Sequence, residues 1–264
     1  MRMIRGLGGT PEGTGPTVVT MGNFDGVHRG HRVILEQVVE TAESQGMSSC
    51  LVTFFPHPLK VLHPERAPSM IQSLEDRQNE IEKAGLDFLE VIPFTFELAA
   101  ISADDFIRDH LIGRLKCREL FVGEDARFGR GREGDVELLT RYSKRGEFKL
   151  HVMPAVEIDG MRISSSRIRR RIEEGDMETA ERMIGRPFSV CGEVVHGEGR
   201  GAKLGFPTAN ILFDGETRPR HGVYACGGPS WTHTYVRVQA SRDGGPSAGI
   251  RWGPGGHEGP AELL

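Results

Sequence analysis

Short, almost continuously apolar runs alternate with segments of helical periodicity between residues 17 and 153, and this alternation constrains the fold more than any other feature. Runs that are apolar on both faces suit strands covered by helices on both sides of a parallel sheet. An antiparallel sheet with one face in water would show a polar residue at every second position. The sequence therefore predicts an α/β fold with a parallel sheet, whose strands are Thr17–Met21, Ser49–Phe55, Asp87–Pro93, Glu119–Gly123 and Lys149–Met153.

Two segments between these runs carry helical patterns of different kinds. In His31–Gln45 the apolar residues fall on one stripe, which is typical of a helix that packs on a core. The segment Ser73–Ala84 is rich in charge, opens on a serine that can cap it and is followed by Gly85. We expect it to form a surface helix whose charges have no functional role.

The pattern changes near Ile184–Pro187, where helical periodicity ends and a glycine-rich stretch with short strand-like pieces begins. We place a domain boundary there, which gives a first domain over 17–185 after a flexible N-terminus of residues 1–16. A second segment covers 186–225. Residues 226–264 contain nine glycines and four prolines without a period, a composition typical of disorder or of a shifted reading frame.

Overall charge and cysteine usage narrow the choice of partners and compartment. The formal net charge of -4 gives no electrostatic reason to expect nucleic acid or an anionic membrane. The four cysteines form neither a metal-type Cys-x-x-Cys pair nor a disulfide framework, which favours a reducing cytoplasm. No apolar stretch approaches the roughly 18 residues that span a bilayer, and the first residues lack the apolar core of a signal peptide. We expect a cytoplasmic protein without a membrane anchor, and its oligomeric state stays open.

The segment GNFDGVHRGH follows the first predicted strand directly and opens the first predicted helix. At the carboxyl end of a parallel strand, a glycine-rich turn lets the backbone approach phosphate, and the next helix directs free N–H groups toward it. His28 and His31 are three residues apart, so both imidazoles can donate to one polyphosphate, while Gly30 leaves room for a nucleotide. The pattern predicts a phosphate-binding site for a nucleotide.

Two alternatives remain for this segment. The histidines could form a metal pair or lie on a surface turn, although metal-binding histidines on a helix are usually four apart and need a third ligand. Asp25 could be a simple turn residue before Gly26.

A second cluster, ISSSRIRRR over 163–171, follows a strand-like stretch and leads into a helix. Serines at a helix start supply a cap and further hydroxyl donors, and arginines neutralise phosphate oxygens bidentately. The cluster predicts a phosphate clamp made by Ser164, Ser165, Ser166 and Arg169. The alternatives are an ordinary capped helix with a solvated basic face, or an RNA-binding patch, which the lack of interleaved aromatic residues disfavours.

These two segments together resemble the paired signature of the Rossmann-like HxGH nucleotidyltransferases. The longer form GNFDGVHRGH resembles the FMN adenylyltransferase module of prokaryotic bifunctional FAD synthetases, as do TFFPHP at 53–58 and VGEDARFG at 122–129. The resemblance covers the whole first domain. Phe55 stands where the family has a carboxylate and Ala126 where it has an aromatic residue, and these departures concern flavin affinity.

The resemblance implies transfer of AMP from ATP to FMN, which gives FAD and pyrophosphate. The FMN phosphate attacks the α-phosphorus in line, so the protein needs alignment and charge neutralisation rather than a nucleophile of its own. By resemblance, His28, His31 and Arg169 are catalytic, and His57, Pro58 and Asp125 face FMN. The resemblance also implies that the ATP site includes Gly22, Asn23, Phe24, Asp25, Gly26 and Gly30, together with Ser164, Ser165 and Ser166. Mg²⁺ is expected to bridge the phosphates, because it is usually held partly by substrate oxygens.

The segment from Gly192 to Asn210 resembles the start of riboflavin kinase, which implies a second, β-barrel module. In that family the threonine and asparagine of the PTAN motif, here Thr208 and Asn210, hold Mg-ATP. Without the resemblance, this motif would be read as a turn. The likeness ends at Ala225, so we expect a truncated barrel with lost or impaired conversion of riboflavin to FMN.

Two further functions compete with FAD synthesis. One is another HxGH nucleotidyltransferase, with nicotinate mononucleotide, phosphopantetheine or a cytidylyl donor as substrate. The other is a flavin- or nucleotide-binding relic without catalysis. Intact His28, His31 and Arg169 favour an enzyme.

Overall fold

A computed structural model describes residues 1–7, 15–190, 193–195, 208–212, 217–228, 231–240 and 246–251. The chain divides into two compact units, and each is described by itself. The first comprises Met1–Ser165 with Arg182–Gly185, and the second comprises Ser166–Glu181 with Arg186–Leu264. The break after Gly185 falls inside the expected boundary segment, but Ser166–Glu181 groups with the second unit rather than with the first domain where we expected it.

The first unit is built on a six-stranded sheet in which every pairing is parallel. The strand order is β1-β4-β3-β2-β5-β6. The five predicted strands are all present, with starts that differ by at most two residues. The strands are β1 Arg2–Arg5, β2 Thr17–Met21, β3 Ser48–Phe55, β4 Phe88–Pro93, β5 Cys117–Gly123 and β6 Lys149–Met153.

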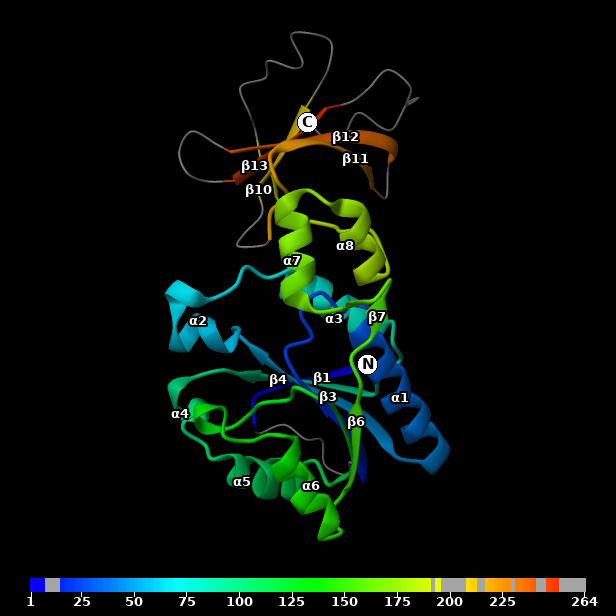
Figure 1. Ribbon diagram of the computed structural model, residues 1–264, viewed down its shortest axis with the longest axis vertical. Coiled ribbons are helices and arrows are strands. Elements are labelled where there is room, and N and C mark those ends of the chain that lie inside the picture. The colour runs from blue at the N-terminus through cyan, green and yellow to red at the C-terminus, as the bar shows by residue number, and fades with distance from the viewer. Residues whose placement is uncertain are drawn as a thin grey trace. The chain divides into compact units, whose positions relative to one another are not determined.

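Helices cover both faces of this sheet, as the apolar runs predict (Figure 1). On one face α1 and α3 pack on a core that includes Leu35, Val38 and Ile81. On the other face the segments from α4 to α6 pack on a core that includes Leu111 and Leu139. The helical segments are α1 Arg29–Gln45, α2 Pro58–Leu62, α3 Leu74–Glu82, α4 Phe96–Ala99, α5 Ala103–Asp105, α6 Val136–Lys144, the 3₁₀ helices η1 Pro64–Arg66 and η3 Arg130–Arg132, and the π-helix η2 Phe106–Arg114.

The N-terminus differs from the flexible segment that we expected. Residues Arg2–Arg5 form β1, which pairs in parallel with β4, and Ile4 is buried. A run of four residues with two arginines is too short to be identified as a strand from the sequence. Its residues are ordered because they pair with β4. Residues 8–14 of the expected segment lie outside the described residues.

The second unit contains most of α7 Ser165–Glu174 and α8 Met177–Ile184, followed by an antiparallel sheet of order β11-β12-β13-β10-β9. A barrel stays a prediction. The expected disorder after residue 225 is contradicted for β12 and β13, since Trp231–Ala240 is rich in aromatic and β-branched residues that favour strands. The strands are β9 Glu193–Val195, β10 Thr208–Leu212, β11 Gly222–Gly228, β12 Trp231–Ala240 and β13 Pro246–Arg251, and residues 252–264 lie outside the described part.

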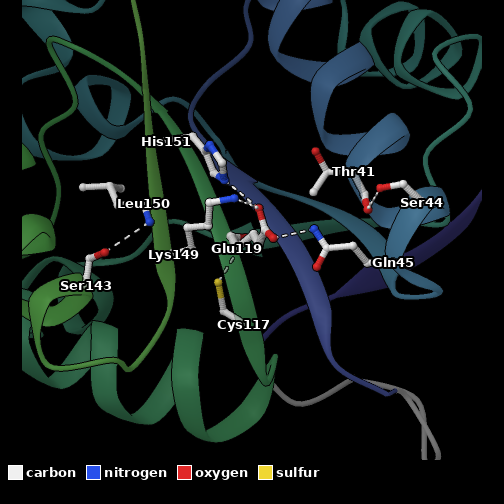
Figure 2. Close-up of polar contacts among 9 residues, drawn as sticks. All are labelled: Thr41, Ser44, Gln45, Cys117, Glu119, Ser143, Lys149, Leu150 and His151. Atoms are coloured by element: carbon white, nitrogen blue, oxygen red, sulfur yellow. Dashed lines mark hydrogen bonds and ion pairs between the residues drawn. The ribbon is translucent and has the colours of Figure 1, made fainter.

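The C-terminal end of α1 is tied to the sheet by a polar cluster around Glu119 (Figure 2). The Glu119 carboxylate accepts from the Gln45 amide on α1 and contacts Nε2 of His151 on β6 at 2.6 Å. Lys149 Nζ lies 3.7 Å from the same carboxylate. Burial alone would raise the pKa of Glu119, but the hydrogen bonds from Gln45 and His151 and the charge of Lys149 lower it below its usual value. The cluster therefore anchors α1 best when Glu119 is ionised.

Glu119→Gln is expected to lower the free energy of unfolding by about 1.5 kcal/mol at neutral pH. Because the folded-state pKa of Glu119 is depressed, its contribution is present above the unfolded value of 4.5 and is lost as pH falls through the folded value. Wild type and variant should therefore converge in stability as pH falls below 4.5. Urea unfolding followed by circular dichroism tests this, with the exposed Glu137→Gln as control. A constant difference across this pH range would contradict the assignment.

Candidate active site

The predicted site residues of the first unit gather where three neighbouring strands end. The GNFDGVH loop follows β2, the His57 loop follows β3, and the GEDARFG loop follows β5. The strand order reverses between β2 and β5, since β3, β4 and β1 lie on one side and β6 on the other. In open α/β sheets, ligands bind in the crevice at this switch point, outside the carboxyl ends of the strands.

The GNFDGVH loop has an unusual backbone that its neighbours hold in place. Phe24 and Val27 have left-handed φ angles of 49° and 35°, and Gly26 has a φ of 82°. A Cβ atom on Gly26 would lie 2.9 Å from Cδ1 of Ile71, so this position requires glycine both for space and for conformation. Left-handed non-glycine residues cost energy and persist where the surroundings determine them. The loop is therefore built to hold a fixed shape.

Two of the predicted ATP-binding side chains in this loop point into the protein. The Phe24 ring is 4% exposed and lies 4.6 Å from the His31 ring, so it supports that histidine from inside. The Asp25 carboxylate is buried and accepts the Ile71 N–H at 3.0 and 3.2 Å. This contact agrees with the alternative in which Asp25 stabilises the turn.

His28 and His31 lie against each other at the start of α1. Their ring centroids are 3.6 Å apart at an interplanar angle of 13°. His28 is the N-cap, and its Nδ1 accepts the His31 N–H at 3.2 Å. A nitrogen that accepts this bond carries no proton, so the proton of the neutral His28 ring resides on Nε2. The cap thus fixes the tautomer and makes Nε2 the donor of the neutral His28 ring.

The surroundings of His31 disfavour a positive charge on its ring. Burial lowers the pKa of His31 well below its usual value, and the charges of His28 and Arg77 lower it further. Its Nδ1 is buried and has no hydrogen-bond partner among the described residues. At neutral pH the free protein therefore presents a neutral His31, and an arriving polyphosphate would supply the negative charge that favours its protonation.

Gly30 leaves space that the His28 ring uses. A Cβ atom at Gly30 would lie 3.2 Å from Cε1 of His28, tighter than an ordinary contact. The sequence suggested that this glycine makes room for a nucleotide, and the structure adds that it also permits the position of His28. At Gly22, a Cβ atom would press on the Phe24 ring at 3.2 Å.

The start of the serine-rich segment meets the GNFDGVH loop. Ser165 Oγ donates to the Asp25 carbonyl at 2.9 Å, across 140 positions of sequence. Ser164 is partly buried just before α7. Ser166 and Arg169 belong to the second unit, where two other arginines of the cluster, Arg170 and Arg171, pair with Glu174 on their own helix. The roles of Ser166 and Arg169 stay predictions.

Two predicted sets of residues meet at Asn23. Its amide lies 3.2 Å from Nε2 of His57, which joins the expected ATP loop to the expected FMN loop. His57 is also the N-cap of α2, since its Nδ1 accepts the Leu59 N–H at 3.2 Å, and Pro58 is the first residue of that helix. The Asn23 atom that faces Nε2 is the amide nitrogen Nδ2, and the tautomer of His57 decides which of the two nitrogens donates.

Asp125, the third predicted FMN residue, is exposed on the loop after β5. Arg162 Nη2 contacts its carboxylate at 3.0 Å, and Arg162 Nη1 lies 3.2 Å from Glu124. Arg162 comes just before the serine-rich segment and was not selected from sequence. Its position next to three serines and opposite an acidic loop is the signal that could have identified it. The predicted FMN residues therefore lie on two loops, after β3 and after β5.

Thr208 and Asn210, the predicted kinase residues, lie on β10 of the second unit. Thr208 pairs with Arg251 on β13, and Asn210 pairs with Gly249 on β13 and with Val195 on β9. They are thus strand residues rather than turn residues. The preceding glycine-rich loop, from 196 to 207, lies outside the described part of the chain.

Neither a preformed metal cage nor a membrane-spanning helix is found in the described part of the chain. In that part, no group of three or more His, Cys, Asp or Glu side chains is arranged to hold a metal ion. The same residues contain no helix that is both long and apolar enough to cross a bilayer.

A parallel α/β sheet with paired histidines of an HxGH motif at the start of the helix after β2 defines the class of HxGH nucleotidyltransferases. The FAD synthetase family matches residues 10–167, and the riboflavin kinase family matches residues 184–238. The chain belongs to the bifunctional riboflavin kinase/FMN adenylyltransferases, with a short C-terminal kinase part.

Similar proteins agree with this family. The bifunctional riboflavin kinase/FMN adenylyltransferase of Escherichia coli K12 is 35% identical over 226 residues, which cover 85% of this chain and 72% of that protein. The protein of the same description from Pseudomonas fluorescens is 37% identical over 252 residues, with 92% and 80% coverage. A crystal structure described as a macrolide-efflux protein from Streptococcus pneumoniae has a TM-score of 0.84 at 26% identity, and the match covers 97% of this chain and 86% of that chain.

Proposed function

We propose that the first unit transfers AMP from ATP to FMN and releases FAD and pyrophosphate. The observation that carries the proposal is the stacked His28–His31 pair at the N-terminus of α1, at the switch point of the sheet. Backbone N–H groups and the helix dipole at this position favour a polyphosphate. The link from Asn23 to His57 places the expected flavin loop beside the expected ATP loop.

In the proposed reaction, a phosphate oxygen of FMN attacks the α-phosphorus of ATP. A new phosphorus–oxygen bond forms as the bond to the β-phosphate oxygen breaks, and pyrophosphate leaves with its electron pair. Negative charge grows on the oxygens around the α-phosphorus and on the leaving group. His28, through Nε2–H, and His31 donate to these oxygens, and the Ser164–Ser165 hydroxyls bind on the pyrophosphate side.

Three further parts of the proposal come from family membership. Arg169 and Ser166 complete the phosphate clamp, while Pro58 and Asp125 contact FMN. When bound with ATP, Mg²⁺ would neutralise phosphate charge. The site lies in a chain that works in the cytoplasm, without nucleic acid or membrane as a partner.

We also propose that riboflavin kinase activity is lost or impaired in this chain. The support is the short match to the riboflavin kinase family, which extends past Ala225, where we expected it to end, but not beyond residue 238. The glycine- and proline-rich composition of residues 226–264 agrees with this. A base that activates the riboflavin hydroxyl is expected by resemblance in the part of the kinase that this region does not match. Thr208 and Asn210 would retain Mg-ATP binding without turnover.

The function is tested by incubating the purified chain with ATP, Mg²⁺ and either FMN or riboflavin, and separating FAD, FMN and pyrophosphate by chromatography. We expect FAD and pyrophosphate in equal amounts from FMN, and no FMN from riboflavin. Replacing FMN with nicotinate mononucleotide or phosphopantetheine tests the rival transferases. No FAD from FMN would reject the proposal and favour the binding relic, and FMN made from riboflavin would reject the loss of kinase activity.

A further inference from the structure

A buried cation lies directly behind the GNFDGVH loop. Arg77 is on α3, in the charge-rich segment that the sequence places on the surface, yet it is 2% exposed. Its Nη1 donates to the Asn23 carbonyl at 2.7 Å. A guanidinium is not taken out of water without partners that repay its desolvation, so a buried arginine bonded to a loop carbonyl points to a requirement for that loop geometry.

Asn23 makes contacts to several parts of the site, through its backbone carbonyl and through its side-chain amide. Besides Arg77, the Thr53 hydroxyl donates to the carbonyl at 3.3 Å, and the Asn23 amide contacts His57. The next residue, Phe24, has a left-handed φ and its ring supports His31. A shift of this one carbonyl would therefore move both the histidine pair and the flavin-side histidine.

We infer that Arg77 is a positioning residue of the adenylyl-transfer site, which fixes the Asn23 carbonyl and so sets the placement of His31 and His57. The inference rests on the proposed function for its kinetic part. It requires no contact between Arg77 and substrate. The guanidinium acts through the loop, and a lysine at this position would keep the charge and one hydrogen bond.

The charge of Arg77 also affects the pKa of His31. After burial and His28, Arg77 is the third cause that lowers the pKa of His31. Other charged groups on the same elements are already paired: Asp25 accepts the Ile71 N–H, and Arg32 on α1 pairs with Glu80 on α3 at 2.8 Å. Removing the Arg77 charge should therefore raise the pKa of His31 toward its usual value, whereas changing Arg32 should affect it little.

The test compares Arg77→Gln with Arg77→Lys, and with Arg32→Gln as the matched control, since Arg32 is also an arginine that joins α1 to α3. We expect Arg77→Gln to lower kcat for FAD formation between about 10- and 100-fold, because small misplacements of reacting groups cost this much. KM for ATP and FMN should change less. The lysine variant should recover most of the rate, and Arg32→Gln should keep the wild-type rate.

A second readout needs no activity. Imidazole NMR of the protein without substrate should show His31 titrating at higher pH in Arg77→Gln than in wild type, and at the wild-type pH in Arg32→Gln. If the Gln variant does not fold by circular dichroism, Thr53→Val removes the other hydrogen bond to the same carbonyl and should give a smaller loss of kcat.

Each outcome has a distinct meaning. A folded Arg77→Gln with wild-type kcat and an unchanged His31 titration overturns the inference. So does a loss of rate that the lysine variant fails to recover when both variants are folded. If wild type itself makes no FAD, the proposed function fails, and the NMR titration still decides whether Arg77 sets the state of His31.

Discussion

Replacing His31 with asparagine is expected to lower kcat for FAD formation by about 10²- to 10³-fold, as loss of one preorganised donor to developing charge usually does. The side chain lies at the N-terminus of α1, stacked on His28, where the α-phosphate oxygens are proposed to gain charge. Asparagine retains a donor but places it on a shorter, unstacked side chain. The ground-state affinity for ATP should fall much less, because backbone N–H groups and the helix dipole remain.

The measurement is steady-state FAD formation for His31→Asn, together with ATP affinity from isothermal calorimetry. The matched control is His63→Asn, because the His63 side chain is 55% exposed and pairs only loosely with Glu65 at 3.7 Å. The control should keep the wild-type rate. His28→Asn should lose rate as well, and because the rings act as a stacked pair, the double variant should lose less than the product of the single effects.

Two results would contradict this assignment. If His31→Asn retained the wild-type kcat, the histidine pair would be a structural feature of the helix start. If kcat/KM and ATP affinity fell by the same factor while kcat stayed unchanged, the pair would act in binding alone rather than in the transition state.

The sequence predicts the fold around the candidate site well where local pattern and position agree. The apolar runs give all five strands that we expected, because strands buried on both faces leave an unbroken signal. The glycine-rich segment after β2 is a turn followed by a helix, and both histidines lie where the spacing places them. Periodicity and turn preferences depend on residues that are close in sequence, so both can be recognised in a single sequence.

The sequence is a poor guide where contacts between residues far apart in the chain determine how a side chain is oriented. Long-range packing against Ile71 and His31 turns the side chains of Asp25 and Phe24 inward, which the local pattern does not show. Their contact with ATP stays a prediction. Arg77 looked like one charge among many on a surface helix. Its spacing of four from Ile81 places both on one helical face, but only the tertiary contact to Asn23 shows why a cation lies there.

The strands missed at each end of the chain have a related cause. The run Arg2–Arg5 is ordered by pairing with β4, and Trp231–Ala240 pairs with β11 and β13. One third of residues 226–264 are glycine or proline, and averaging over that window concealed a ten-residue run in which six residues are aromatic or β-branched. Whether such segments form strands depends on cross-strand partners that are distant in sequence.

A buried acid and histidine on the other face of the sheet are expected to control the stability of the first unit. Glu90 on β4 is fully buried, His110 on η2 is 5% exposed, and His110 Nε2 lies 2.9 Å from a Glu90 carboxylate oxygen. The second carboxylate oxygen and the second imidazole nitrogen have no hydrogen-bond partner among the described residues. Each group thus depends on the other for its single strong contact.

Substituting His110→Leu should therefore lower the free energy of unfolding by about 3 to 5 kcal/mol, because it leaves the Glu90 carboxyl buried without its partner. Replacing both residues, as Glu90→Leu with His110→Leu, should recover much of this loss, since apolar side chains of similar volume leave no polar group to desolvate. The β4 and η2 elements would then pack through apolar contact alone.

Urea unfolding of the two single variants and the double variant, followed by far-ultraviolet circular dichroism, measures the coupling. This probe suits the first unit, because both tryptophans of the chain, Trp231 and Trp252, lie in the second. The exposed His63→Leu is the control and should change stability by less than about 0.5 kcal/mol. A loss below about 1 kcal/mol for His110→Leu would mean that the Glu90 carboxyl finds another partner when the imidazole is removed, and that the two elements are held by apolar packing rather than by this pair.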